Sequence, residues 1–279
     1  MIAALGDLVE DVVVRLDGPI NDASDTAATI VRRRGGSAAN VAASVARLGG
    51  SARFLGQVGA DAIGVALTDE LARDGVDVSC VRRDGSTGTI VALVDPSGER
   101  SMLTDRRACA DLDDPDPGWL DGVSVLHVPF YSLAGGKLAV TAVTLIGWAH
   151  ERGVIVSIDA SSQAVLRDFG RAEARVLIEA QAPDVVFANA DEAAELDITG
   201  SVGGALTVVK HGASPTVVHP TNGTAFVVPV IRIAAPLDTT GAGDAFAAGF
   251  LMALDRSDDP DAACVAAHRA AAALLTTRA

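Results

Sequence analysis

Along most of the chain, short apolar runs alternate with longer segments in which apolar residues recur at helical spacing. The short runs are typical of buried strands and the longer segments of amphipathic helices. Buried strands are predicted at 2–8, 52–58, 123–128, 154–158, 184–187 and 206–209. Helices are predicted at 35–48, 63–73, 137–151, 165–180, 190–196 and 262–276. This alternation predicts an α/β fold with a doubly wound, mostly parallel sheet that binds ligands at the carboxyl ends of its strands.

Two segments, near residues 11–34 and 86–104, do not follow this alternation. Their strand patterns and turn residues predict short β-strands outside the main sheet. Hairpins are predicted at 89–94 with 100–104 and at 216–219 with 225–228. We therefore expect a single domain, 1–279, with a small β lid inserted at about 11–34 and 86–104.

The composition narrows the class of protein. Of the 279 residues, 49% are apolar but only 4% are aromatic, so the core must be mainly aliphatic, as in a covered parallel sheet. The net charge of −14 argues against nucleic acid as a partner, because phosphate backbones bind basic surfaces. The three cysteines are too widely spaced for a disulfide framework or zinc site. Because no signal peptide or membrane-spanning run is apparent, we expect a cytoplasmic protein with no membrane partner.

The segment 238–246 places two glycines and an alanine between two carboxylates, and an apolar run that predicts a helix follows it. Small residues at a helix start leave backbone N–H groups free to bind an anion, here those of Gly241, Ala242 and Gly243. Asp244 stands in the first turn, where its carboxylate can take a proton from a hydroxyl beside the bound anion. This pairing suits phosphoryl transfer to an alcohol. The alternative is an ordinary glycine-rich turn before a core helix.

A second segment of small residues covers 35–40. Gly35 and Gly36 let the backbone approach a ligand closely, and Asn40 offers both a donor and an acceptor to vicinal hydroxyls. Asp11 stands where the first strand leaves the sheet, a place where a carboxylate can hold a sugar hydroxyl. The alternatives are a helix start capped by Ser37 and a solvated turn residue at Asp11.

Together, the two segments resemble the signatures of the ribokinase-type (PfkB) carbohydrate kinases. The N-terminal match is Gly35-Gly36-x-Ala38-x-Asn40-x-Ala42. The C-terminal match is Asp238-Thr239-x-Gly241-Ala242-Gly243-Asp244, followed by Ala248-Gly249-Phe250-Leu251. The two lie in the family's order, and the resemblance extends from end to end of the chain. It implies a ribokinase-like fold and transfer of a phosphoryl group from ATP, with Mg²⁺, to a hydroxyl of a small sugar or sugar acid.

The resemblance also implies roles for the matching positions. Asp244 is the expected catalytic base, and the amides of Gly241, Ala242 and Gly243 are the expected anion hole. The residues expected to hold the sugar are Asp11, Gly35, Gly36 and Asn40. Asn189 and Glu192 match an Asn-x-x-Glu motif in which the glutamate orients Mg²⁺ and the phosphates through water. The same pair fits a helix N-cap with its capping-box glutamate, and the two roles can coexist.

Three further residues are candidates for nucleotide binding. Lys210 and Gly212 follow a predicted strand, at the place where the family contacts the ATP phosphates and ribose. Lys210 is one of two lysines in the chain and can neutralise a phosphate. His268, in the last predicted helix, is a candidate neighbour of the adenine, and a core or surface histidine is the alternative.

The nature of the acceptor rests on weaker signals. Arg106 resembles the arginine by which acid-sugar kinases of the family reach substrate, but Gln163 stands where those relatives carry a second arginine. Alternative partners for Arg106 are the carboxylates of Asp105, Asp111 and Asp113. The arginines at 32–34 are interpreted as solvated lid charge. No aromatic residue stands at 9–34 or 86–104 to stack on a base, so a sugar or sugar acid is favoured over a nucleoside.

Other classes of protein remain as alternatives. Within the kinases the alternative is a nucleoside kinase. A non-catalytic sugar or nucleotide sensor would be expected to lack Asp244 or the glycines, and both are present. A dinucleotide-dependent oxidoreductase needs Gly-x-Gly-x-x-Gly after the first strand, and this chain has Gly6-Asp7-Leu8 there. The exposed edges of the lid strands favour a homodimer paired through the lid.

Overall fold

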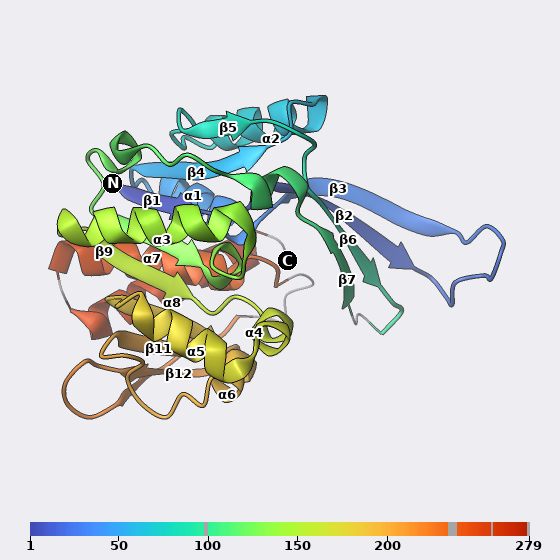
Figure 1. Cartoon of the computed structure of the whole chain (residues 1–279). Helices are drawn as coiled ribbons and strands as arrows, with labels where there is room; N and C mark the ends of the chain where they lie inside the picture. Colours follow the sequence, from blue (N-terminus) through green and yellow to red (C-terminus); the bar gives the residue numbers. More distant parts are fainter. Residues whose placement is uncertain (98–99, 234–238, 258, 278–279) are drawn as a thin grey trace.

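The computed structural model describes residues 1–97, 100–233, 239–257 and 259–277 and arranges them around one large sheet (Figure 1). The strand order is β13-β12-β11-β10-β9-β8-β1-β4-β5. Pairing is parallel from β11 to β5, and β12 and β13 are added antiparallel at one edge. The strands are β1 (Ile2–Leu5), β4 (Ala52–Val58), β5 (Val81–Arg83), β8 (Val125–Pro129), β9 (Ile155–Asp159), β10 (Val185–Asn189), β11 (Leu206–His211), β12 (Ser214–His219) and β13 (Phe226–Val228). The predicted doubly wound, mostly parallel sheet is confirmed.

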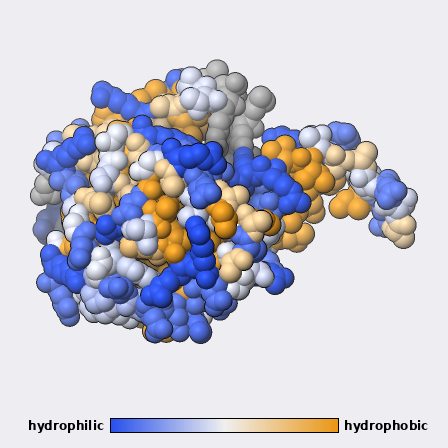
Figure 2. Space-filling model, turned by 90° about the horizontal axis from the view of Figure 1, so that it is seen from above, coloured by the Kyte–Doolittle hydropathy of each residue, from blue (hydrophilic) through white to orange (hydrophobic). Residues whose placement is uncertain are grey.

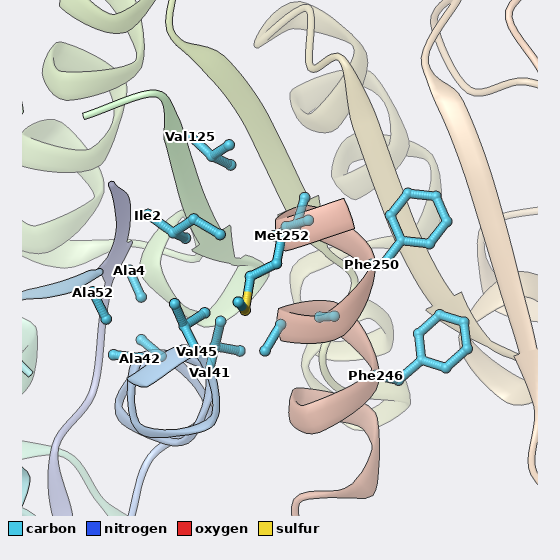
Figure 3. Packing of buried hydrophobic residues seen from close by; sticks show 14 of the residues in the cluster. Ile2, Ala4, Val41, Ala42, Val45, Ala52, Val125, Phe246, Phe250 and Met252 are labelled. Atoms are coloured by element: carbon cyan, nitrogen blue, oxygen red, sulfur yellow. The ribbon is translucent and has the colours of Figure 1, made fainter. Parts of the chain in front are cut away.

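Helices cover both faces of this sheet and form two separate cores. The first core lies against α1 (Ser37–Arg47), α2 (Ala62–Arg73), α7 (Ala242–Ser257) and α8 (Pro260–Thr276). The second lies against α3 (Gly136–Glu151), α4 (Gln163–Phe169), α5 (Arg171–Ala180) and α6 (Ala190–Glu195). Figure 3 shows the first core, where Val41 and Val45 of α1 and Met252 of α7 pack together beside Ile2 of β1. This packing holds α1 against α7. In the described part of the chain, no helix combines the length and apolar character needed to cross a membrane.

A second, four-stranded sheet projects from the body (Figure 1), and we call it the lid sheet. Its order is β3-β2-β6-β7, from β2 (Val9–Leu16), β3 (Ala28–Gly35), β6 (Thr89–Val94) and β7 (Arg100–Asp105). These strands fall in the two segments predicted to lie outside the main sheet. Figure 2 shows hydrophobic residues on the projecting part, where Ile30, Val31, Met102 and Leu103 are exposed. Pairing of two copies through this sheet remains a prediction.

Two details of the predicted secondary structure are wrong. The single helix predicted at 165–180 is two helices, α4 and α5, because Gly170 between them has φ 104°, a left-handed conformation that ends a helix. The first strand ends at Leu5, and the chain continues into β2 of the lid sheet. The hairpin of β12 with β13 is confirmed, and β11 extends it into an antiparallel meander.

Candidate active site

The two glycine-containing motifs meet at Asp244, in the first turn of α7. Ser37 Oγ donates to one carboxylate oxygen of Asp244 at 2.7 Å, and Asn40 Nδ2 donates to the other at 3.0 Å. Burial raises the pKa of Asp244 from 3.8 to about 6, although the two hydrogen bonds oppose this rise. The Asp244 carboxylate is therefore oriented by two hydrogen bonds, and its pKa lies about one unit below neutral pH. Gly36 occupies the N-cap position of α1, so the alternative interpretation in which Ser37 caps this helix is wrong.

The turn before Asp244, residues 239–243, has a conformation that glycine allows, and we call it the anion-hole turn. Gly241 has φ 79°, a left-handed value that strains other residues. The Ala242 N–H donates to the Thr239 carbonyl at 3.1 Å, so this amide is engaged within the turn. No acceptor for the N–H of Gly241 or Gly243 occurs among the described residues. Two of the three predicted anion-hole amides thus stand at the start of a long helix without a described acceptor, and a role for Ala242 requires its turn bond to break.

The predicted sugar-binding residues lie where the lid sheet joins the body. Asp11 pairs with Arg33 across β2 and β3, and its side chain is only 14% exposed, so it is not a solvated turn residue. Burial raises the pKa of Asp11, and Arg33 partly offsets the rise. A Cβ on Gly35 would stand 2.1 Å from Asp11 Oδ1, and one on Gly36 would stand 2.0 Å from the Asp7 carbonyl oxygen. Gly36 is therefore required by a close approach of two backbone segments, whereas Gly35 leaves the space that the Asp11 carboxylate occupies.

Replacing Gly35 by alanine should displace the Asp11 carboxylate, because the new Cβ would occupy its position. We expect kcat/KM for the acceptor to fall by about 10²-fold, as for other small displacements of binding groups. The measurement is steady-state kinetics with saturating nucleotide. Gly18→Ala is the matched control, since that glycine stands in the segment joining β2 and β3 with no heavy atom within 4 Å of a new Cβ. Equal losses in both variants would contradict the role of Asp11.

Across the sheet, the carboxyl ends of β9, β10 and β11 bring a lysine and two carboxylates together. Lys210 Nζ donates to Asp159 Oδ2 at 2.8 Å. Glu192, in the first turn of α6 after β10, is the second carboxylate whose charge acts on Lys210. Burial lowers the pKa of Lys210, but Asp159 and Glu192 outweigh it and the net pKa is raised. A Cβ on Gly243 would stand 3.5 Å from Lys210 Nζ, so the ammonium group borders the anion-hole turn. This arrangement suits a phosphate group.

Asp159 is a member of this cluster that the sequence predictions did not assign. The available signal was its place at the end of a central strand, where ligands of open α/β sheets bind. Its contact with Lys210 spans 51 residues and cannot be inferred from local spacing.

The Asn189–Glu192 pair forms a complete capping box at the start of α6. Glu192 N–H donates to Asn189 Oδ1 at 2.9 Å, and Asn189 N–H donates to Glu192 Oε2 at 2.8 Å. The Glu192 side chain is buried, and burial together with the charge of Asp159 raises its pKa to about 7. The capping interpretation is confirmed, and the role of Glu192 toward Mg²⁺ remains a prediction.

A cavity of about 640 Å³ opens between the β11–β12 turn, the start of α7 and α8. It brings together residues predicted to bind the nucleotide with one glycine of the anion-hole turn. Those lining it are Lys210, Gly212, Gly243 and His268. The His268 ring meets Phe246 edge-on at 5.2 Å, and burial lowers its pKa. The lining is mostly apolar with few polar groups, as is typical of a small-molecule site.

Arg106 lies at the root of the lid sheet and is held by partners that sequence reasoning did not identify. Its Nε and Nη2 donate to the two oxygens of Asp7 at 2.8 and 2.7 Å, and Nη1 donates to the Tyr131 carbonyl at 2.9 Å. Pairing with Asp105 is wrong, since that carboxylate accepts from Arg107. Direct binding of substrate by Arg106 remains a prediction. Its guanidinium already forms a bidentate ion pair with Asp7.

The interpretation of residues 32–34 as solvated charge is wrong for two of the three arginines. The Arg34 side chain is only 5% exposed and donates to Asp74 at 2.8 Å. Arg33 is 29% exposed and contacts Asp11 and Thr240. Arg32 is 64% exposed and pairs with Glu10. In the position where an acid-sugar kinase would have a second arginine, Gln163 donates to Glu195 at 3.0 Å.

Comparisons with known proteins cover all or most of this chain. The family model described as pfkB family carbohydrate kinase matches residues 1–279. An ATP-dependent ribose-1-phosphate kinase of Halopiger xanaduensis is 34% identical over 90% of this chain and 83% of its own length. A fructokinase of Klebsiella pneumoniae is 31% identical over 93% of this chain and 86% of its own length.

Solved structures show the same architecture. A sugar kinase of Pyrococcus horikoshii in complex with ATP superimposes with a TM-score of 0.86 at 26% identity, covering 100% of this chain and 93% of that one. Adenosine kinase of Sinorhizobium meliloti superimposes with a TM-score of 0.85 at 25% identity, covering 99% and 93%. Both signature motifs, the ribokinase-like fold and the family match over its whole length place this chain in the PfkB family of carbohydrate kinases.

Proposed function

We propose that this protein is an ATP-dependent kinase that phosphorylates a hydroxyl of a small sugar or sugar acid, with Asp244 as the general base. The observation that carries the proposal is the position of Asp244. It lies between the cavity bordered by Gly243 and Lys210 and the root of the lid sheet, held by Ser37 and Asn40. A carboxylate in this position can accept the hydroxyl proton as the oxygen attacks. The Gly241 and Gly243 amides and Lys210 stabilise the charge on the transferred phosphoryl group.

ATP as the phosphoryl donor is supported by two relatives and by the cavity. The Halopiger xanaduensis relative is named as ATP-dependent, and the Pyrococcus horikoshii structure contains ATP. The cavity of about 640 Å³ lies within the range of sites that bind molecules of this size. His268 and Phe246 contribute an apolar part of its wall, which suits a base. Lys210 also lines the cavity and borders Gly243, so it is proposed to contact the phosphates.

Mg²⁺ is proposed to be held by the phosphates of the nucleotide and by Glu192 through water. Magnesium sites of this kind use few protein carboxylates and keep several waters. In the described ranges no group of three or more metal-ligating side chains is present, which fits such a site better than a cage built by the protein. When bound, the ion would neutralise charge on the phosphate oxygens.

The acceptor is proposed to be a monosaccharide or an acidic derivative of one, such as a sugar acid or a sugar phosphate. Relatives are named for ribose 1-phosphate and fructose, and a structural neighbour for adenosine. In the described part of the lid sheet no aromatic side chain is available to stack on a nucleobase. The carboxylate of Asp11 and the amide of Asn40 instead offer hydrogen bonds to hydroxyl groups.

An ADP-release assay with ATP and Mg²⁺ tests the proposal. The panel should contain ribose, ribose 1-phosphate, fructose, 2-keto-3-deoxygluconate and adenosine, with mass spectrometry to identify the product. We expect turnover with a sugar or an acidic sugar and little with adenosine. Turnover with adenosine alone would establish the nucleoside alternative. Binding of ATP with no turnover of any acceptor would favour the sensor, and absence of ATP binding would contradict the proposal.

A further inference from the structure

One side chain of the lid sheet reaches the anion-hole turn. Arg33 lies near the end of β3, and its Nη2 donates to Thr240 Oγ1 at 3.3 Å, a contact that spans 207 residues. The same guanidinium places Nε 3.8 Å from Asp11 Oδ2. Thr240 directly precedes Gly241, whose left-handed conformation shapes the turn. Arg33 thus contacts both the acceptor side and the phosphoryl side of the site.

Its two neighbours in the sequence bind elsewhere. Arg32 pairs with Glu10 at 2.8 Å within the lid sheet, and Arg34 pairs with Asp74 just after α2 at 2.8 Å. The pattern follows from strand alternation, which points Arg33 to the opposite face of β3 from Arg32 and Arg34. Arg32 is therefore a matched control for Arg33, because it has the same charge and is adjacent in the chain.

We propose that Arg33 is a positioning residue that ties the lid sheet to the anion-hole turn. The planar guanidinium presents several N–H donors in a fixed fork, so it can contact Asp11 and Thr240 together, which a single ammonium group does less well. An acceptor bound at Asp11 and the turn that receives the phosphoryl group are then joined through one side chain. Loss of Arg33 leaves both halves of the site in place but loosens the turn relative to the lid. This inference rests on the proposed kinase function.

The kinetic test compares Arg33→Ala, Arg33→Lys and Thr240→Val with Arg32→Ala. We expect kcat to fall about 10- to 100-fold in the first three, within the range that loss of positioning costs, with little change in KM for ATP. Thr240→Ser keeps the hydroxyl and should retain activity. The double variant Arg33→Ala/Thr240→Val should be no slower than either single variant, because the two residues act through one contact. Arg32→Ala should match the wild type.

A readout without catalysis separates this proposal from the kinase assignment. Hydrogen exchange of the amides at 239–246 in the protein without substrates should be faster in Arg33→Ala and in Thr240→Val, and unchanged in Arg32→Ala. That result supports the tie even if no acceptor in the panel is phosphorylated. Unchanged exchange in both variants would overturn the proposal. So would kinetics in which Arg33→Ala only raises the KM for the acceptor and Thr240→Val has no effect, a result that would assign Arg33 to acceptor binding.

Discussion

Asp244→Asn is expected to lower kcat by about 10²- to 10⁴-fold, the usual contribution of a general base. Asparagine keeps the size of the side chain beside Ser37 and Asn40 but cannot accept the hydroxyl proton. Binding of ATP should change little, because Asp244 is proposed to act on the acceptor. The measurement is kcat with saturating substrates, together with nucleotide affinity by calorimetry. A variant that retains wild-type kcat would remove Asp244 from the chemistry.

The pH dependence should identify the same group. Because Asp244 must be ionised to act as a base and its pKa is raised to about 6, kcat/KM of the wild type should rise as pH increases through that value. Glu192, with a pKa of about 7, titrates in the same range. The acid limb should therefore be measured in Glu192→Gln as well. Persistence of the limb in Glu192→Gln assigns it to Asp244, and its disappearance assigns it to Glu192.

The melting temperature of Asp244→Asn shows whether its loss of activity reflects unfolding. A carboxyl whose folded pKa lies above its unfolded pKa stabilises the fold at low pH, and that contribution is lost as pH rises through the folded pKa. At pH 8 the wild type therefore carries the cost of a desolvated charge that asparagine lacks. We expect Asp244→Asn to melt at the same temperature as the wild type or higher at pH 8. A large fall in melting temperature would mean that the activity loss reflects unfolding.

Lys210→Met is expected to lower kcat by about 10²- to 10³-fold, comparable to loss of one group that stabilises a developing charge. Its ammonium group borders the anion-hole turn at Gly243, so its removal leaves the transferred phosphoryl group without that positive charge. The same change leaves Asp159 buried without its ion-pair partner. Breaking a buried pair on one side costs about 3–5 kcal/mol of stability. Both kcat and the free energy of unfolding should be measured.

The double variant Asp159→Asn/Lys210→Met separates these two effects. It removes both charges, so much of the lost stability should return while kcat stays low. Recovery of kcat along with stability would show that Lys210 is only a structural partner of Asp159. Asp159→Asn alone should keep the ammonium group but release it from its anchor, and we expect an intermediate loss of kcat.

How far the sequence predicts this structure depends on the range of the contacts involved. The strand at 52–58 has the predicted bounds because a buried run between turn residues is a local signal. The break at Gly170 was missed because the apolar periodicity continues through it. Asn40, Ser37 and Asp244 show the limit at the site. Their motifs were predicted separately, and the bonds between them follow only from the packing of α1 against α7.

Long-range partners account for the other differences. The alternative partners for Arg106 are carboxylates nearby in the sequence, but the carboxylate that it contacts, Asp7, is 99 residues away. Asp159 gained its place in the site from the register of β9 with β10 and of β10 with β11. Motif spacing therefore predicts which residues are candidates, and sheet topology decides which of them can act together.

The bonds from Ser37 and Asn40 to Asp244 also bear on how the protein reaches its active form. They span 207 and 204 residues. Contacts so distant along the chain form slowly, because a long loop must close before they contribute. On the ribosome, α1 emerges long before α7 and must wait for it. Catalytic competence is therefore expected to be acquired only after α7 has been synthesised, when the strands of the large sheet have already been made.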